Sequence, residues 1–314
     1  MKYVSYMVLI NQIAALFLIM FFGYFLRKKE VIKEKQRDFL FDLLLDYILP
    51  FMVISAMIID FEPGMLENVK YLLISWAGVY LFMIIFASVI ARIIPGSDRH
   101  KRTIEFLMIF SNVVYMGLPV LGAIFPDYGV FYGSIGIIPF NVVLWTYGVY
   151  LLQDDGSKFE FNRLIKIFNN NGTLALAIGF IILLTGINLP AALVEAIDLI
   201  GDATFPISML VIGASLYGMD LRKIVIKPQL IGLSFFKLII LPLATFFLLL
   251  LFPLDSTLVA VIAVQISMPV AANSVIFTAR FPVDYKLATE GVFLTTFLAL
   301  FTIPLIVVIV SGIL

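Results

Sequence analysis

Apolar segments about as long as a bilayer is thick recur along the chain, separated by short polar connections. A helix that crosses the hydrocarbon needs roughly 20 mostly apolar residues at about 1.5 Å per residue. Hydrophobic residues make up 62% of the 314 and charged residues only 13%, whereas a soluble domain averages about 45–50% and about 25%. We therefore predict an all-α polytopic membrane protein with ten transmembrane helices. Their predicted limits are 7–26, 40–59, 71–94, 103–125, 128–152, 173–189, 196–216, 229–252, 256–279 and 287–312.

The basic residues divide unevenly between the connections. Of the 21 Lys and Arg residues, 18 lie in connections or at span ends on one side of the predicted membrane, Lys2 and Lys70 lie on the other side, and Lys237 lies inside the eighth span. Basic connections face the cytoplasm, so both termini are expected on the non-cytoplasmic side of the plasma (inner) membrane. The first apolar run, 7–26, is followed rather than preceded by its charges, so we interpret it as a retained span and not as a signal peptide.

The longest connection, 153–171, divides the chain into two groups of five spans, residues 1–155 and 156–314. Because five is odd, the second group would run upside down relative to the first, as in the inverted repeats of many secondary carriers. Corresponding spans share features: an Asp precedes a Pro by four residues in spans 2 and 7, and spans 4 and 9 each contain a proline. These residues are Asp46 and Pro50, Asp202 and Pro206, Pro119, and Pro269. We predict two inverted five-helix repeats.

Spans 4 and 9 hold the residues of the predicted substrate site. Proline removes a helical hydrogen bond, so we expect span 4 to break around Gly117 to Pro119 and span 9 near Pro269. Half-helix N-termini suit an anion and C-terminal ends suit a cation, and side-chain amides can donate to a carboxylate. The alternative is purely structural, because such residues are frequent in ordinary membrane helices. The predicted substrate-binding residues are Asn112, Gly117, Pro119, Gln265, Ser267, Pro269 and Asn273.

Ionisable side chains inside the spans are few, and each is costly to bury unless it is paired or hydrated. Asp46, Asp202 and Lys237 are candidates for ion coupling, with H+ or Na+ as the coupling ion, and either acid could instead pair with Lys237. A structural pair or a solvated helix end is the alternative for all three and for Glu290. His100 lies among connection charges and is interpreted as a solvated residue.

Other function classes find no support in the residues. Cysteine is absent and histidine occurs once, so thiolate sites, cysteine nucleophiles and multi-histidine metal sites are excluded. No HExxH, GxGxxG or GxxxxGK[ST] motif occurs, and 21 basic residues balance 21 acidic ones, which leaves no field to attract nucleic acid. We expect no enzyme activity, no cofactor and no nucleic-acid partner.

Three sequence runs resemble the auxin efflux carrier family, in particular its short prokaryotic members. They are NVVYMGLP at 112–119, QISMPVAANSVIFTARF at 265–281 and LATEGVFLTTFLALFTIPL at 287–305. The resemblance covers the whole chain and implies a fold like that of the bile acid:sodium symporters and sodium/proton antiporters. In that fold, scaffold and transport domains are each drawn from both halves, and the broken spans 4 and 9 cross in the transport domain. Related folds also imply a homodimer through the scaffold.

The resemblance further implies roles for single residues. Asn112 matches the asparagine that binds the substrate carboxylate in the family, and Pro119 and Pro269 match the crossover prolines. Asn273 follows the pattern of the prokaryotic members, whereas plant carriers have an apolar residue there. The implied substrates are malate, malonate or another small carboxylate, rather than auxin itself.

Three functions are weighed on these grounds. The leading hypothesis is a carrier that exposes a mid-membrane carboxylate site to each side in turn by moving a transport domain against a scaffold. A sodium-coupled bile acid or organic anion symporter is the second. A membrane sensor without transport is the third, although the longest internal connection is too short for an output domain. Direction of transport and coupling ion stay open.

Overall fold

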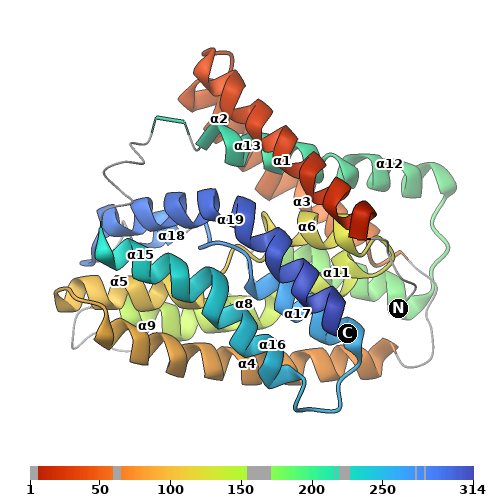
Figure 1. The fold of residues 1–314 in the computed structure, drawn as a ribbon. Helices are drawn as coiled ribbons and strands as arrows, with labels where there is room; N and C mark the ends of the chain where they lie inside the picture. The colour runs from red at the N-terminus through yellow and green to blue at the C-terminus, as the bar shows by residue number, and fades with distance from the viewer. Residues whose placement is uncertain are drawn as a thin grey trace. The chain divides into compact units, whose positions relative to one another are not determined.

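The computed structural model describes residues 6–58, 65–153, 171–215, 217–218, 227–272, 274–278 and 281–314 (Figure 1). Within these residues the chain is helical, and its one isolated β-bridge joins Ser111 to Val270. The chain divides into two compact units, and each unit combines segments from the first and the second half of the sequence. The predicted repeats, 1–155 and 156–314, concern symmetry between the two halves of the sequence, and a division into compact units does not test that symmetry.

Unit 1 comprises Met1–Lys70, Val114–Ile137 and Phe168–Gly218. Within it, α1 packs along α13, α3 packs against both α11 and α12, and α6 packs against α7. The elements of this unit are α1 (Tyr6–Lys28), α2 (Glu34–Leu43), the π-helical turn η1 (Leu44–Ile48), α3 (Leu49–Ser55), α6 (Gly117–Ile124), α7 (Gly129–Ile135), α11 (Asn171–Thr185), α12 (Ala191–Asp202) and α13 (Thr204–Ser215).

Unit 2 comprises Tyr71–Val113, Ile138–Ile167 and Met219–Leu314. Here α19 contacts α5, α15, α17 and α18, and α16 packs on α17. The elements of this unit are most of α4 (Met65–Ile93), α5 (Asp98–Ile109), α8 (Ile137–Val143), η2 (Leu144–Gly148), α9 (Val149–Leu152), α15 (Pro228–Phe235), η3 (Phe236–Ile240), α16 (Leu241–Leu249), α17 (Ser256–Ile266), α18 (Ser274–Thr278) and α19 (Tyr285–Ile313).

Five helical stretches among the described residues are long and apolar enough to cross a membrane. They correspond to the predicted spans 3, 5, 7, 8 and 10, and shorter apolar helices lie where spans 6 and 9 are predicted. The count of ten spans therefore stays a prediction. The five stretches are Glu67–Ile93, Gly129–Leu152, Ala191–Ser215, Pro228–Leu249 and Tyr285–Ile313.

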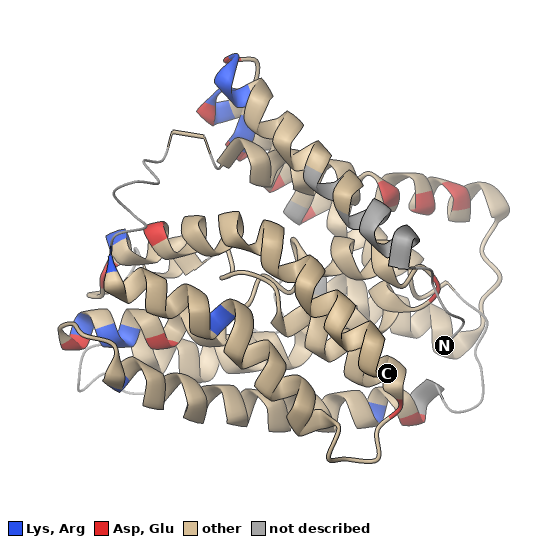
Figure 2. Ribbon diagram, in the orientation of Figure 1, with Lys and Arg blue, Asp and Glu red and all other residues tan. Residues whose placement is uncertain are grey.

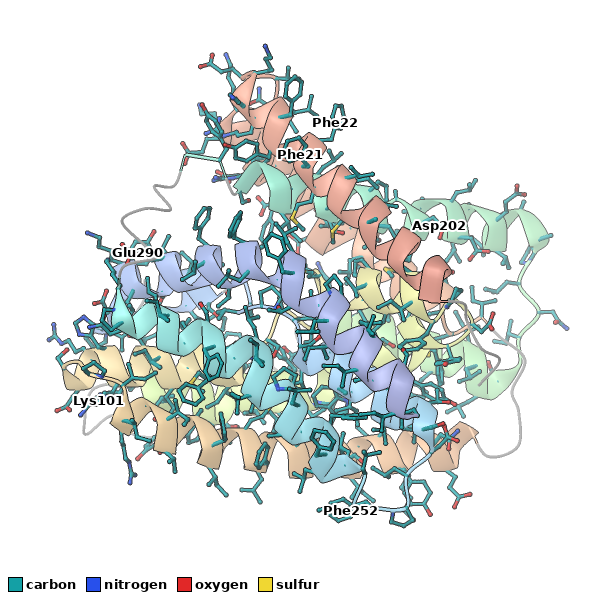
Figure 3. The ribbon with its side chains drawn as sticks, viewed as in Figure 1. Phe21, Phe22, Lys101, Asp202, Phe252 and Glu290 are labelled. Carbon is teal, nitrogen blue, oxygen red and sulfur yellow. The ribbon has the colours of Figure 1, made fainter. Side chains whose placement is uncertain are left out.

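Most basic residues lie at helix ends within each unit, whereas the acidic residues of α12 are spaced along that helix (Figure 2). In unit 2, Lys and Arg lie near the start of α5, α15 and α19 and near the end of α4, and Figure 3 places Lys101 and Glu290 at this end. In unit 1, basic residues gather at the connection between α1 and α2. Large apolar side chains instead lie exposed along helix sides, as Phe21 and Phe22 do on α1 (Figure 3). This distribution is the one that a lipid environment favours.

The helix predicted for 103–125 is interrupted, but earlier than expected. α5 ends at Ile109 and α6 begins at Gly117, so Gly117 and Pro119 lie in the first turn of the second helix and not in the break. Proline is well tolerated there because the first N–H groups of a helix have no intrahelical acceptor. The second interruption runs from the end of α17 at Ile266 to the start of α18 at Ser274, and it contains Pro269.

The crossing of α1 and α13 in unit 1 depends on two glycines. A Cβ atom on Gly213 would collide with the carbonyl of Met20, and one on Gly23 would collide with the carbonyl of Leu210. Small residues at such positions let two membrane helices approach closely enough for backbone contact. A side chain at either glycine would force the two backbones apart.

Gly213→Ala should therefore destabilise the protein, by about 1–3 kcal/mol, because the new methyl group overpacks a backbone contact. Gly78→Ala in α4 is the matched control, since nothing lies within 4 Å of a Cβ built there. Removing that glycine should be neutral or stabilising by up to about 1 kcal/mol. Thermal unfolding of the detergent-purified variants measures both effects, and equal midpoints for the two would contradict the close crossing.

Candidate functional site

The two helix interruptions pair through backbone groups that belong to unit 2. The amide N–H of Asn112 donates to the carbonyl of Pro269 at 2.7 Å, and the N–H of Ala271 donates to the carbonyl of Phe110 at 2.9 Å. Together with the antiparallel bridge between Ser111 and Val270, these bonds form a very short two-stranded pairing. They satisfy backbone groups that the helix breaks release, which is a requirement for non-helical backbone in a membrane.

Residues of α17 and α19 shape the second interruption. Pro269 has no N–H, so it cannot donate one of the hydrogen bonds that would extend α17 beyond Ile266. The N–H of the next residue, Val270, donates to Oγ1 of Thr295 in α19 at 3.2 Å. Thr295 is buried, and its hydroxyl donates to the carbonyl of Gly291 one turn earlier. α19 therefore holds the break from one side.

Lys237 stabilises the first break through hydrogen bonds from its side-chain nitrogen. Its side chain is fully buried in unit 2, and Nζ donates to the carbonyl of Met108 at 2.8 Å and to Oγ of Ser111 at 2.5 Å. Lys237 lies in η3, a π-helical turn in the middle of a predicted span. Such turns insert an extra residue in an α-helix and often occur at functional sites.

Asn112 is a residue of the first break whose side-chain oxygen has unused hydrogen-bonding capacity. The residue is only 4% exposed, and its Oδ1 has no hydrogen-bond partner among the described residues. Leaving a buried amide oxygen unpaired costs about 1–3 kcal/mol. A ligand or water that donates a hydrogen bond to this oxygen would relieve the cost.

The structure brings four of the predicted site residues together: Asn112, Gln265, Pro269 and Lys237. Gln265 is buried, and its Nε2 donates to the carbonyl of Val113 at 3.3 Å. Ser267 is adjacent but bonds its own helix, because Oγ donates to the carbonyl of Val264 at 2.7 Å. Gly117 and Pro119 lie buried in α6 of unit 1, and Asn273 lies outside the described residues.

The two acidic candidates for ion coupling lie in unit 1, whereas Lys237 lies in unit 2. Asp46 lies in η1, and Oδ1 of its exposed carboxylate accepts a hydrogen bond of 3.0 Å from Nδ2 of Asn171 at the start of α11. Asp202 is exposed at the end of α12 (Figure 3). Lys237 forms no ion pair with a carboxylate of the described residues; its side chain instead donates to a backbone carbonyl and a hydroxyl.

Sequence reasoning missed three buried polar residues of unit 2: Ser111, Thr295 and Glu105. Glu105 is 9% exposed on α5, and its Oε1 accepts a 2.5 Å hydrogen bond from the hydroxyl of Tyr147 in η2. Its position inside the predicted span 103–125 was an available signal, since acids are rare there. Nothing distinguishes Ser111 and Thr295 from other hydroxyl residues in the sequence.

The charged end of unit 2 holds a polar pocket of about 250 Å³ between the starts of α5, α15 and α19. His100 Nε2 lies 3.0 Å from Oδ2 of Asp284, so His100 is paired rather than simply solvated. Glu290 pairs with Lys227, in agreement with a structural role. Among the described residues, no group of His, Cys, Asp and Glu is arranged to hold a metal ion.

Ser111→Ala should destabilise unit 2 more than Ser267→Ala, although both serines are buried. The Ser111 hydroxyl accepts from Lys237 and donates to the carbonyl of Ile266 at 3.3 Å, so its loss leaves a buried ammonium without one partner. We expect about 1–3 kcal/mol for Ser111→Ala and about 1 kcal/mol or less for Ser267→Ala, measured by thermal unfolding. The reverse order would contradict the bridging role of Ser111.

The pair of Glu105 and Tyr147 is open to a double-mutant cycle. Tyr147→Phe leaves the carboxyl group of Glu105 without its donor, and Glu105→Leu leaves the tyrosine hydroxyl without its acceptor. The double variant should be more stable than the sum of the single effects predicts, by about 0.5–3 kcal/mol. Additive midpoints in thermal unfolding would show that this contact contributes nothing to stability.

Comparison with known proteins gives matches along nearly the whole chain. The family described as membrane transport protein matches residues 8–307. The uncharacterized transporter YfdV of Escherichia coli K12 is 26% identical, over 94% of this chain and 96% of its own length. The YfdV proteins of Escherichia coli O157:H7 and Shigella flexneri match with the same identity and coverage.

The match covers nearly the whole chain, and the family is the one that the three sequence runs indicate. Its description and the names of the relatives refer to transport and not to catalysis. The chain therefore belongs to the membrane transport protein family, that of the auxin efflux carriers, and is a multi-pass membrane transporter.

Proposed function

We propose that the protein is a secondary transporter for a small organic anion of the malate or malonate class, which binds at the paired helix breaks. In this proposal ten helices form two inverted repeats in the plasma membrane, both termini lie on its non-cytoplasmic side, and spans 4 and 9 cross at mid-membrane. The observation that carries the proposal is the break itself: two interrupted segments paired by backbone bonds around the buried, incompletely bonded amide of Asn112.

The chemistry of the break favours an anion. An asparagine side chain has two N–H groups that can donate to a carboxylate, and the unpaired Oδ1 of Asn112 can accept from a hydroxyl or a water that comes with the ligand. The neighbouring residue, Ser111, accepts a hydrogen bond from Nζ of Lys237, so the protonated lysine would place a positive charge beside the residue next to Asn112. No acidic side chain of the described residues bonds to Asn112, Ser111 or Lys237 to oppose an anion.

The two units provide the parts that alternating access needs. Unit 2 carries the paired breaks and would act as the transport domain, and unit 1 would act as the scaffold. Rigid-body movement of one part against the other around a fixed site is the general mechanism of carriers with repeated folds. A homodimer through the scaffold, in contact with lipid on its remaining faces, completes the proposal.

Uptake of labelled malate and malonate into proteoliposomes tests the function. Wild-type protein should give saturable uptake, and Asn112→Ala should reduce uptake by at least about 10-fold, since a hydrogen bond to a charged ligand contributes about 1.5–3 kcal/mol. Parallel assays under imposed proton and sodium gradients identify the coupling ion.

Asn68→Ala is the matched control, because Nδ2 of Asn68 bonds the hydroxyl of Tyr132 in unit 1, away from the paired breaks in sequence and in unit. It should keep wild-type uptake. If neither dicarboxylate moves under any gradient, the substrate class is wrong. If uptake occurs and Asn112→Ala matches wild type, the site does not lie at the break.

A further inference from the structure

Two helix C-termini meet at the paired breaks. α5 ends at Ile109 and α17 ends at Ile266, and the interruptions that follow them are bonded to each other. A helix C-terminus carries about half a negative charge, and its last carbonyl groups have no partner in the helix. The break therefore concentrates negative potential from two helices in the buried interior of unit 2.

The oxygen atoms at this point are those that a small cation prefers. Backbone carbonyls and a serine hydroxyl face inward, and in broken-helix carriers the C-terminal half-helix ends and loose carbonyls bind the coupling sodium ion or proton. A buried concentration of negative potential needs a positive charge nearby to be stable.

The Lys237 ammonium already supplies that charge. It bonds the carbonyl of Met108 in the last turn of α5 directly, at 2.8 Å. It reaches the end of α17 through Ser111, whose hydroxyl accepts from Lys237 and donates to the carbonyl of Ile266. One ammonium group thus bridges the ends of both helices.

We propose that Lys237 is a tethered cation that occupies the place of a mobile coupling cation, so that the protein neither binds nor requires sodium at the paired breaks. The inference that transport needs no sodium rests on the function proposed above, whereas the role of Lys237 as the cation at the two helix ends does not. In its protonated form Lys237 keeps a positive charge at the ends of both helices, where it attracts the carboxylate that binds beside Asn112.

The competing explanation is a lysine that only fills space in the structure. Both explanations require a buried side chain, so they differ in whether the charge is needed. The cost of placing a charge in a membrane interior is several kcal/mol unless it is paired, whereas Met or Leu would fill the same volume without that cost. If Lys237 served only to fill space, an apolar residue would replace it at no loss. If it serves as the cation, its removal leaves a site that a small free cation can fill.

Thermal unfolding of the detergent-purified full chain tests the cation site without any knowledge of the substrate. Wild type should give the same midpoint in sodium chloride and in choline chloride of equal ionic strength. Lys237→Ala should unfold at a lower temperature, and n-propylammonium chloride should raise its midpoint in a saturable manner, by about 2–4 °C over choline chloride.

Leu238→Ala is the matched control. Leu238 is the neighbouring residue in η3 and is equally buried, so its truncation also leaves a cavity but removes no charge. Its midpoint should fall and should not respond to n-propylammonium. An equal response of both variants, or none from Lys237→Ala, would overturn the proposal. So would a saturable rise of the wild-type midpoint with sodium.

Two further variants, Lys237→Met and Lys237→Arg, test the proposal if the alanine variant does not fold. Arg keeps the charge and Met keeps only the volume, so the Arg variant should have the higher unfolding midpoint. A Met variant as stable as wild type would refute the tethered cation.

In proteoliposomes, wild-type malate or malonate uptake should be equal in sodium and choline media. Failure of all carboxylate uptake would refute the proposed function, while the unfolding data would still decide the role of Lys237.

Discussion

Unpaired backbone groups are the constraint on which the rest of this structure depends. Two of its apolar segments stop being helical deep inside unit 2, and every N–H and C=O released there needs a partner that water cannot supply. The chain meets this demand by pairing one break with the other, through Asn112 with Pro269 and Ala271 with Phe110. Neither break could exist alone at that depth. Their pairing joins two segments more than 150 residues apart and makes the site a product of both halves of the sequence.

Side chains from neighbouring helices form hydrogen bonds with backbone groups that the pairing of the breaks leaves without a partner. Thr295 accepts from the N–H that follows Pro269, and Lys237 and Ser111 connect the carbonyl ends of α5 and α17. After these contacts, the amide oxygen of Asn112 still lacks a partner among the described residues. At the proposed substrate site this acceptor stays available to a ligand, which then does not have to displace a contact of the empty protein.

The π-helical turns place three of the polar side chains. η1 contains Asp46, η2 contains Tyr147 and η3 contains Lys237. In each case an extra residue changes the helix face that the following side chains occupy. Helical periodicity read from the sequence assumes 3.6 residues per turn, so it places such side chains on the wrong face. This is one reason why Lys237 could be recognised as an unusual residue in an apolar segment but not assigned a partner.

The sequence by itself determined the class of protein, the positions of the long apolar segments and the family, because hydrophobic length and a few motif residues are local properties. It also identified Asn112, Gln265, Pro269 and Lys237 as residues of interest. Only the tertiary structure decided that these four lie together, that span 4 breaks before Gly117, and that Lys237 bonds a carbonyl and a hydroxyl instead of Asp46 or Asp202. The physical reason is that a proline's effect depends on its place in a helix, and that the partner of a buried charge is set by packing between distant segments.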